Sequence, residues 1–159
     1  MRVSIRLAER GDAVRLNAAL TLLSADLGDP HPATDAMLEA AGWGQSPAFR
    51  AQLAEVAGGI VGVTMYSPVF STSRGGAGAY ISDLWVAADQ RATGLGRRLL
   101  GAVAADAARC WGARFLKLQV YDSSPGARRF YDRLGFTAAT GHTDMILQAA
   151  GFAALKGDA

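Results

Sequence analysis

Hydrophobic and polar positions follow regular periods along most of the chain, and the first part predicts a strand followed by two helices. Residues 3–8, VSIRLA, alternate between apolar and polar side chains with the period of a half-buried strand. Asp12 then stands at the start of a helix whose apolar stripe is formed by Leu16, Leu20, Leu23 and Leu27. Thr34 caps a shorter second helix, which we expect to end at Gly42.

The central part of the chain predicts a β-hairpin, a loop and a further strand. The segments AFRAQLAEV (48–56) and GIVGVTMY (59–66) flank a glycine turn, which is typical of a hairpin. Residues 67–78, SPVFSTSRGGAG, are rich in small and turn-forming residues, and we expect them to form a flexible loop that borders a site. The segment AYISDLWVA (79–87) predicts the next strand.

A long helix and another strand follow. The apolar residues of the helix recur at every fourth position, as Leu95, Leu99, Val103 and Ala107. Gly112 is suited to end this helix, because glycine adopts the left-handed conformation found just after many helices. Residues 114–121, RFLKLQVY, then predict a strand.

The last part of the chain predicts one more helix and two more strands. Ser124 is expected to cap the helix, which stops at Gly135. The segments FTAA (136–139) and TDMILQ (143–148) predict the final strands. The tail from Ala149 onward shows no clear pattern.

The composition is that of a single folded domain spanning residues 1–159. Half of the residues are apolar and 19% are charged, a balance that excludes a disordered chain. No apolar run approaches the roughly 20 residues that cross a bilayer, and residues 1–10 lack the apolar core of a signal peptide. We therefore expect a soluble cytoplasmic protein without a membrane partner. The single cysteine, Cys110, has no neighbours with metal-ligand spacing, so we expect no disulfide and no metal site.

The charges are unevenly distributed along the chain. Residues 1–89 carry six basic and nine acidic side chains, whereas residues 90–133 carry nine basic and three acidic ones. This asymmetry favours an anionic ligand on the basic part and a cationic ligand on the acidic part, although a chance distribution of surface charges would look the same. The basic residues are not embedded in a helix-turn-helix, zinc or aromatic RNA-binding signature, so we expect no nucleic-acid partner.

Glycines and arginines gather where the long helix begins, in DQRATGLGRRLLGAV (89–103). Such a junction binds anions, because the first N–H groups of a helix lack an intrahelical partner and the helix dipole adds partial positive charge. Gly94 and Gly96 let the backbone approach a bulky anion, and Arg91 adds charge. A P-loop is excluded because no lysine stands nearby, and Leu99 at the third glycine position disfavours a dinucleotide fingerprint. A glycine-capped structural helix is the alternative interpretation.

Two motifs in this part of the chain resemble the signature segments of the GNAT superfamily of N-acetyltransferases. The first is RxxGxG, Arg91 to Gly96, directly behind DLWV. The second is AxxFYxxxGF, one predicted strand later, at Ala127, Phe130, Tyr131, Gly135 and Phe136. The resemblance covers Ala48 to about Leu147. It implies an α/β (α+β) fold, in which a mixed, mostly antiparallel sheet of about seven strands splays between strands 4 and 5 and is flanked by about four helices.

The resemblance implies acetyl-CoA as the cofactor and assigns its pyrophosphate to the glycine loop. The pyrophosphate would accept hydrogen bonds from the backbone N–H groups of six consecutive residues, Ala92, Thr93, Gly94, Leu95, Gly96 and Arg97. Arg91 would add charge, whereas Arg98 fits an exposed position on the helix better than a cofactor contact.

The peptide-like pantetheine arm would lie along the strand before the loop, pairing as an added strand with the backbone of Leu84, Trp85 and Val86. One N–H group there would also receive the charge that develops on the thioester oxygen. The second motif segment completes the cofactor contacts with Ser124, Ala127 and Phe130. Ser124 stands where the family often has asparagine, whose side chain is longer.

The reaction requires a base for the acceptor amine and an acid for the departing thiolate. By the resemblance, Tyr131 is the acid, because family members with a tyrosine at this position use it so; a core aromatic residue is the alternative. Asp83 is the only ionisable group in the middle of the strand that would face the thioester, and we expect it to act as the base. Because an acid flanked by apolar residues is costly unless functional or paired, a buried structural salt bridge is the alternative.

A closer resemblance, to the spermidine/spermine and thialysine N-acetyltransferases, lies in GIVGVTMY, in AYISDLWV and in DAMLEAAGWGQSPAF (35–49). Those enzymes hold and deprotonate a cationic amine with two adjacent acids on this strand. Asp83 matches the second acid, whereas Ser82 stands in place of the first, a glutamate. Asp26 and Asp29, at the end of the first helix, are further candidates for substrate contacts, unless they only solvate the helix end.

These features predict an acetyl-CoA-dependent N-acetyltransferase. We expect it to act on the primary amine of a small cationic or amino-acid-like substrate, by direct attack of the amine on the thioester. Two alternatives stay open: an acetyl-CoA-binding module without turnover, and acetylation of a protein or peptide amine. Relatives in the superfamily are often dimers with the substrate pocket near the interface, so the resemblance also implies a homodimer.

Overall fold

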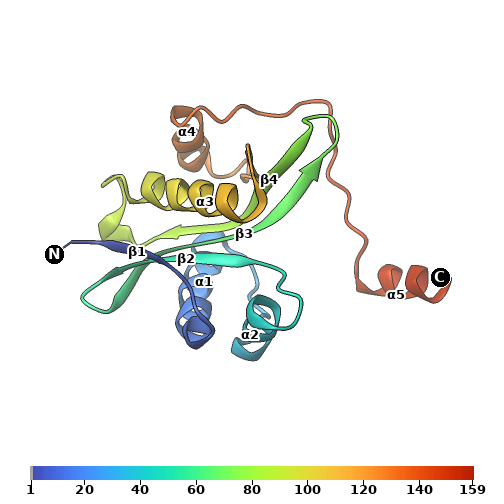
Figure 1. Cartoon of the computed structure of the whole chain (residues 1–159), viewed down its shortest axis with the longest axis horizontal. Helices are drawn as coiled ribbons and strands as arrows, with labels where there is room; N and C mark the ends of the chain where they lie inside the picture. The colour runs from blue at the N-terminus through green and yellow to red at the C-terminus, as the bar shows by residue number, and fades with distance from the viewer. Residues whose placement is uncertain (1) are drawn as a thin grey trace. The chain divides into compact units, whose positions relative to one another are not determined.

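The computed structural model describes residues 2–159, whose contacts divide the chain into two compact units (Figure 1). The first unit ends at Val120, and the second is Tyr121–Ala159. No helix among the described residues is both long enough and apolar enough to span a membrane.

The first unit is built on a five-stranded sheet with the strand order β1-β2-β3-β4-β5. The strands are β1 (Ser4–Leu7), β2 (Arg50–Val56), β3 (Gly59–Ser71), β4 (Gly76–Val86) and β5 (Leu116–Leu118). Neighbouring strands are antiparallel except for β4 and β5, which are parallel. The predicted mixed, mostly antiparallel sheet of an α/β fold is therefore confirmed, with five strands in the described residues in place of about seven.

Three helices of the first unit pack on this sheet: α1 (Ala13–Leu27), α2 (Asp35–Trp43) and α3 (Leu95–Trp111). Two single turns of 3-10 helix, η1 (Arg10–Asp12) and η2 (Ala88–Gln90), lie before α1 and after β4. Helices α1 and α2 cover one face of the sheet and α3 covers the other (Figure 1). The apolar stripe of α1 accounts for the first core, which includes Leu16, Leu20, Leu53, Val63 and Trp85. On the opposite face, α3 packs through Leu95 and Leu99 against Ala54.

A buried polar network fixes α3 against β2 and β3. The Asp106 carboxylate accepts hydrogen bonds from the Tyr66 hydroxyl at 2.5 Å and from Arg50 Nε at 2.7 Å. Arg109 donates to the same carboxylate at 2.6 Å, and Gln52 donates to the Tyr66 oxygen at 3.0 Å. Burial opposes ionisation of Asp106, but its three donors outweigh burial and lower the pKa to about 2. The network therefore holds α3, and the loop at its N-terminus, in place on the sheet.

Asp12 begins α1, but not in the way that the sequence predicts. It is the residue before the helix, yet its carboxylate makes no capping hydrogen bond to the first turn. Instead it accepts hydrogen bonds from both terminal nitrogens of Arg6, at 2.7 and 2.8 Å. Arg6 also donates through Nε to Glu55 of β2 at 2.9 Å. Hydrogen bonding to Arg6 lowers the pKa of Asp12 to about 2, and the cluster ties the start of α1 to two strands.

Two predicted helix ends are confirmed and one shifts by a residue. Thr34 Oγ1 accepts a hydrogen bond from the first turn of α2 at 3.2 Å, and Gly112 ends α3 with a φ of 64°. Helix α2 continues past Gly42 to Trp43. Gly42 lies inside the helix, and a side chain there would clash, because the ring of Phe49 lies only 2.7 Å from where a Cβ would be.

The prediction of a flexible loop at residues 67–78 is wrong. Strand β3 continues to Ser71 and β4 starts at Gly76, so only residues 72–75 form the turn. Pro68 is accommodated in β3 because β2 pairs with β3 only as far as Tyr66, which leaves one edge of β3 without a ladder beyond that residue. The small residues of this segment therefore extend a hairpin instead of bordering a site.

The second unit contains α4 (Pro125–Arg133) and α5 (Ala149–Gly157), and an extended segment runs between them (Figure 1). The prediction of strands at 136–139 and 143–148 is wrong, since neither segment forms a strand. An alternating pattern shows which side chains favour burial, but a strand also requires a neighbouring strand with which to form hydrogen bonds. Residues 121–159 contain no such strand. Helix α5 occupies the tail, for which the sequence shows no clear pattern.

Candidate active site

A bulge in β4 determines which side chains face which side of the sheet. Asp83 pairs with Met65 of β3, but the next pair is Ile81 with Tyr66, so Ser82 is an extra residue in β4. Met65 packs against the core under α1 and α2, whereas Tyr66 reaches across to α3. Asp83 therefore faces the side of α1 and α2, although Ile81, two residues earlier, faces α3.

Strands β4 and β5 diverge at the same point. Their parallel ladder joins residues 79–81 to residues 116–118 and stops at the bulge, so β5 is shorter than the strand predicted at 114–121. Residues 83–86 pair with β3 on one edge, and the described residues form no ladder along the other. The splay expected between strands 4 and 5 is therefore present. It leaves backbone groups of Leu84, Trp85 and Val86 open to a peptide-like ligand.

The chain turns sharply between Val86 and α3. After η2, Ala92 has a φ of 60° and Gly94 a φ of 85°, so two residues of the loop are left-handed. Thr93 Oγ1 donates a hydrogen bond to the carbonyl of Gln90 at 2.6 Å, which closes the turn. Glycine adopts this conformation without strain, whereas a residue with a Cβ does not. The turn therefore requires a glycine at position 94 and stores strain at Ala92.

The first turn of α3 lacks a side-chain cap. Gly94 is the residue before the helix and has no side chain to offer, and the hydrogen bond from Arg98 N to Gly94 O at 3.1 Å is the first of the helix. The N–H groups of Leu95, Gly96 and Arg97 precede that bond and lack intrahelical partners. Arg97 is exposed beside them, whereas Arg98 donates to the carbonyl of Val3 at 2.9 Å. This helix start suits an anion, and Arg98 is engaged elsewhere.

Arg91 joins two parts of the candidate site that the sequence assigns to different ligands. Its Nε donates to the carbonyl of Val86 at 3.0 Å, and its Nη2 donates to the carboxylate of Asp26 at 2.8 Å. Both side chains of the ion pair are about half exposed, at 55% and 49%. Exposed ion pairs are weak, so either partner can be drawn to a charged ligand. Asp29 lies just beyond α1, where its backbone N–H donates to the carbonyl of Ser24 at 2.9 Å.

Asp83 lies half-buried on the α1 and α2 side of β4. Burial raises its pKa, while a hydrogen bond from Ser82 and the charge of His31 act in the opposite direction. No salt bridge to Asp83 exists among residues 2–159, so the buried ion pair that was the alternative interpretation is not found. Ser82 itself is exposed. The geometry presents a carboxyl group with a raised pKa to the space beside the open strand edge.

The sequence did not predict a role for His31, which lies in the segment between α1 and α2. Its ring is held from both sides, with Nδ1 2.8 Å from Ser24 Oγ and Nε2 2.8 Å from Asn17 Oδ1. Asn17 donates its amide to Asp35 at 2.8 Å, so its oxygen accepts a hydrogen bond from Nε2–H of the ring. The only feature of the sequence that could have pointed to His31 is its position as an isolated histidine between two prolines. Since the charge of His31 acts on Asp83, His31 belongs to the acceptor side of the site.

The residues of the second motif gather on one face of α4. Ala127, Phe130 and Tyr131 are half-buried, and the ring of Tyr131 packs against Phe130 and Phe136 with centroids 5.1 and 5.5 Å apart. Burial raises the pKa of the Tyr131 phenol, so the group stays protonated at neutral pH. Ser124 precedes the helix as predicted, but its hydroxyl makes no capping hydrogen bond.

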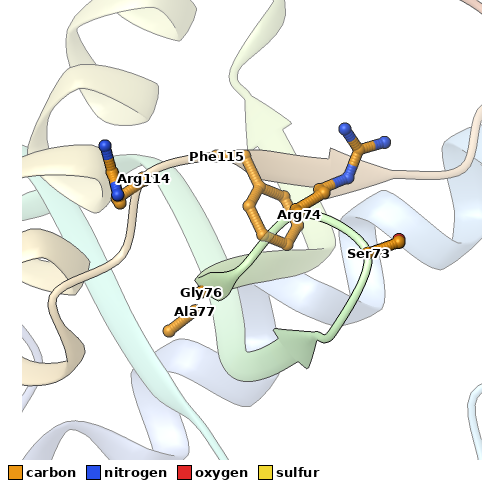
Figure 2. Close-up of a pocket in the computed structure, with 6 residues that line it drawn as sticks. All are labelled: Ser73, Arg74, Gly76, Ala77, Arg114 and Phe115. Carbon is orange, nitrogen blue, oxygen red and sulfur yellow. The ribbon is translucent and has the colours of Figure 1, made fainter.

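A separate open hollow lies at the other end of β4. It is lined by the β3–β4 turn, the start of β4 and the two residues before β5, and Figure 2 shows Phe115 between the two arginines Arg74 and Arg114. The Arg74 guanidinium lies 5.2 Å from the centre of the Phe115 ring, which is a cation–π contact. Its lining includes neither Asp83 nor any residue of the glycine loop, so this hollow is no part of the candidate site.

Comparisons with known proteins agree with this arrangement. The model of the acetyltransferase (GNAT) family matches residues 16–136. A search of curated protein sequences finds no match.

Solved structures share the fold at low sequence identity. An integron cassette protein from the mobile metagenome of V. cholerae is 19% identical, with a TM-score of 0.79 and 98% of each chain covered. A ribosomal-protein-alanine N-acetyltransferase from Brucella melitensis is 22% identical, with a TM-score of 0.72, and the match covers 92% of this chain and 99% of that one. An aminoglycoside acetyltransferase from an uncultured soil sample, in complex with sisomicin, is 17% identical, with a TM-score of 0.76 and coverage of 92% and 97%.

The family model spans most of the chain and includes both motifs, but it does not extend over residues 137–159 of the second unit. The solved structures have the same fold over at least nine-tenths of the chain. The chain therefore belongs to the GNAT family of acetyltransferases, and it is an N-acetyltransferase of the acetyl-CoA-dependent kind that this family generally represents.

Proposed function

We propose that this acetyltransferase moves the acetyl group of acetyl-CoA to the primary amine of a small cationic or amino-acid-like acceptor. The observation that carries the proposal is the meeting of three features at one end of β4: an open strand edge, a glycine loop at a helix start and a half-buried carboxyl group. The reaction requires a groove for a peptide-like arm, a site for an anion and a base. All three features come from residues 83–97.

The residues present fit acetyl-CoA. The left-handed residues Ala92 and Gly94 and the uncapped first turn of α3 together aim N–H groups at one place, which suits the pyrophosphate. The open edge of Leu84, Trp85 and Val86 suits the pantetheine arm, which carries amide groups of its own. When bound, the cofactor supplies an activated acetyl thioester. We assign further cofactor contacts to Arg91 and Arg97 and, on α4, to Ser124, Ala127 and Phe130.

Asp83 is the base in this proposal. The carboxylate accepts the proton that the acceptor's ammonium group must lose before nitrogen can attack. Burial raises the pKa of Asp83, so its ionised form is a stronger base than an exposed aspartate. Asp83 forms no salt bridge within residues 2–159, so its carboxylate is available to the acceptor's ammonium group.

Tyr131 is the acid. Burial against Phe130 and Phe136 keeps its phenol protonated at neutral pH, so it has a proton to give to the departing thiolate. A phenol is suited to this step because it is a weak acid that keeps its proton at neutral pH, whereas the departing thiolate must gain one.

The acceptor side is acidic, which favours a cationic amine. Asp83 and Asp26 supply carboxylates, Asp29 lies beside the end of α1, and Ser82 lines the bulge. A serine in place of a second acid on β4 argues against polyamines in particular. The similarity to a structure holding sisomicin, an aminoglycoside, supports a small amine, whereas the similarity to a ribosomal-protein-alanine N-acetyltransferase supports a peptide amine as the second candidate.

Thiol release from acetyl-CoA tests the proposal with a panel of polyamines, lysine analogues, aminoglycosides and peptides with free N-termini. We expect turnover with at least one small amine and little with the peptides. Cofactor binding measured by calorimetry, without turnover on any amine, would identify a binding module and contradict the proposal. We further propose that the enzyme is a homodimer, as the resemblance to the family implies.

A further inference from the structure

The ring of His31 is held in one orientation by an asparagine whose own orientation is fixed. Asn17, a buried residue of α1, donates its amide nitrogen to the carbonyl of Ala33 at 3.3 Å and to the carboxylate of Asp35 at 2.8 Å. These two acceptors turn the amide oxygen of Asn17 toward the ring, 2.8 Å from Nε2. Nε2 therefore carries a hydrogen in both the neutral and the charged ring, and only Nδ1 gains or loses a proton.

The partner of Nδ1 suits both states of the ring. Nδ1 lies 2.8 Å from the hydroxyl oxygen of Ser24. A hydroxyl donates a hydrogen bond to the bare nitrogen of a neutral imidazole and accepts one from the N–H of a charged imidazole. His31 can therefore take up a proton without losing a hydrogen bond. Since histidine ordinarily changes charge between about pH 5 and 8, the charge at position 31 can change near neutral pH while the fold stays the same.

His31 lies on the same side of the sheet as Asp83. Asp83 pairs with Met65 of β3, and Met65 packs against the core that also receives Leu23 of α1 and Ala33, two residues after His31. Burial raises the pKa of Asp83, and the charge of His31 acts in the opposite direction, so the two side chains interact. A positive charge on His31 thus offsets the negative charge that a cationic acceptor requires.

The other ionisable groups around the ring are acids. Asp35 begins α2 and reaches the ring through Asn17, and Asp29 lies two residues before His31 in the same segment. Neither Asp35 nor Asp83 forms a salt bridge with a basic side chain within residues 2–159. The protonation state of His31 therefore decides how strongly this group of carboxylates attracts a cation.

We propose that His31 determines the pH range in which the enzyme accepts a cationic amine: the neutral ring admits the ammonium group beside Asp83, and the charged ring opposes it. This inference rests on the proposed function, which assigns the acceptor to Asp83. Two positive charges beside one carboxylate repel each other, whereas an uncharged acceptor is not affected. By the same coupling, a bound amine drives the proton from the ring into water. His31 is therefore a specificity-determining residue that acts on acceptor binding.

Two substitutions at position 31 test the effect of the charge. The acceptor is the amine that gives the fastest thiol release in the panel, and the pH is about 8, where an ordinary histidine is neutral. His31→Lys carries a permanent charge and His31→Gln carries none, so the KM for the amine should be about tenfold higher in the lysine variant, with similar kcat. Thr72→Lys adds the same charge to the exposed β3–β4 turn and should behave like the parent. Circular dichroism checks the fold of each variant.

Nitrogen NMR of the chain labelled at histidine observes the ring directly and needs no substitution of His31. The chain contains two histidines, and His142→Gln identifies the signals that belong to His31. Without amine, the ring nitrogens of His31 should change from the neutral to the charged pattern as the pH falls from about 8 to about 5. At the midpoint of that change, the amine, added together with CoA, should return His31 toward the neutral pattern.

The outcomes separate this inference from the proposed function. Turnover of an amine with equal KM in His31→Lys and His31→Gln would overturn the role of His31 and leave the acetyltransferase reaction in place. A ring that stays neutral down to about pH 5, or that keeps its protonation state when the amine binds, would overturn it as well. Absence of turnover with every amine would overturn both proposals.

Discussion

The guanidinium of Arg91 lies 2.8 Å from the carboxylate of Asp26, so a side chain that the sequence assigns to the cofactor neutralises one assigned to the acceptor. A bound pyrophosphate would draw Arg91 away and release Asp26 for a cationic amine. We therefore expect Asp26→Asn to tighten CoA binding by about two- to fivefold, the range that an exposed ion pair supports. Calorimetric titration with CoA measures the change.

Two variants control this prediction. Arg91→Gln should weaken CoA binding, and Asp26→Asn should have no further effect in that background, because the ion pair is already lost. Glu39→Gln breaks another exposed pair, the one with Arg10 at 3.1 Å, and should leave CoA affinity unchanged. Weaker or unaltered binding by the single Asp26 variant would show that the ion pair does not compete with the cofactor.

Asp83→Asn should lower kcat/KM by at least about 100-fold, because it removes the base. The same change should raise the melting temperature: burial raises the pKa of Asp83, so its ionised form costs stability at neutral pH, and asparagine removes that cost. For the parent enzyme, kcat/KM should fall as the pH drops through this raised pKa. Asp89→Asn, at an exposed position just past β4, should change neither quantity. A variant that is both inactive and less stable would indicate a structural role for Asp83.

Tyr131→Phe should lower kcat at neutral pH by about 10- to 100-fold, because the proton donor is lost while the ring remains. Its contacts with Phe130 and Phe136 are retained, so the affinity for acetyl-CoA and the melting temperature should hardly change. Steady-state kinetics and calorimetry measure these effects. Tyr121→Phe, which removes an exposed phenol, is the control. An unaltered rate in the Tyr131 variant would assign this residue to packing alone.

Gly94→Ala and Gly101→Ala should have opposite effects, although neither added Cβ would meet another atom within 4 Å. Gly94 has a φ of 85°, so alanine there carries about 1 kcal/mol or more of backbone strain, and the displaced loop should bind CoA at least about tenfold more weakly. Gly101 lies inside α3, where alanine should stabilise the fold by about 0.5–1 kcal/mol and leave CoA binding intact. Thermal unfolding and CoA titration compare the two. Equal CoA affinities would remove the glycine loop from the cofactor site.

Asp106→Asn should destabilise the protein by about 3 kcal/mol at neutral pH, because it breaks a buried ion pair and weakens the hydrogen bond from Tyr66. The folded-state pKa of about 2 lies below that of an unfolded aspartate. The stabilisation is therefore complete above the unfolded pKa and is lost as the pH falls through about 2. Urea unfolding near pH 7 and near pH 3 should show the difference between parent and variant shrinking in acid. A difference that is constant with pH would mean that the charge of Asp106 contributes nothing.

Local patterns carry much of the fold because they act over a few residues. The leucine stripe of α1, the hydroxyl cap at Thr34 and the left-handed end of α3 at Gly112 are each read from neighbouring positions. The same holds for the turn at Gly94, whose positive φ only a glycine adopts without strain. The same local patterns wrongly predict strands at 136–139 and 143–148, because strand formation also depends on a pairing partner, and the pattern of the segment itself does not show whether one exists.

By itself, the sequence determined the first four helices, most strands of the first unit, both family motifs and the glycine loop, since propensity, capping and φ preferences are local. Only the tertiary structure decided that Ser82 forms a bulge, that Asp83 and Ile81 face opposite sides of the sheet, and that Arg91 pairs with Asp26. It also decided that His31 acts on Asp83. Each of these depends on the register of paired strands or on elements that lie far apart in the chain, and no short stretch of sequence encodes either.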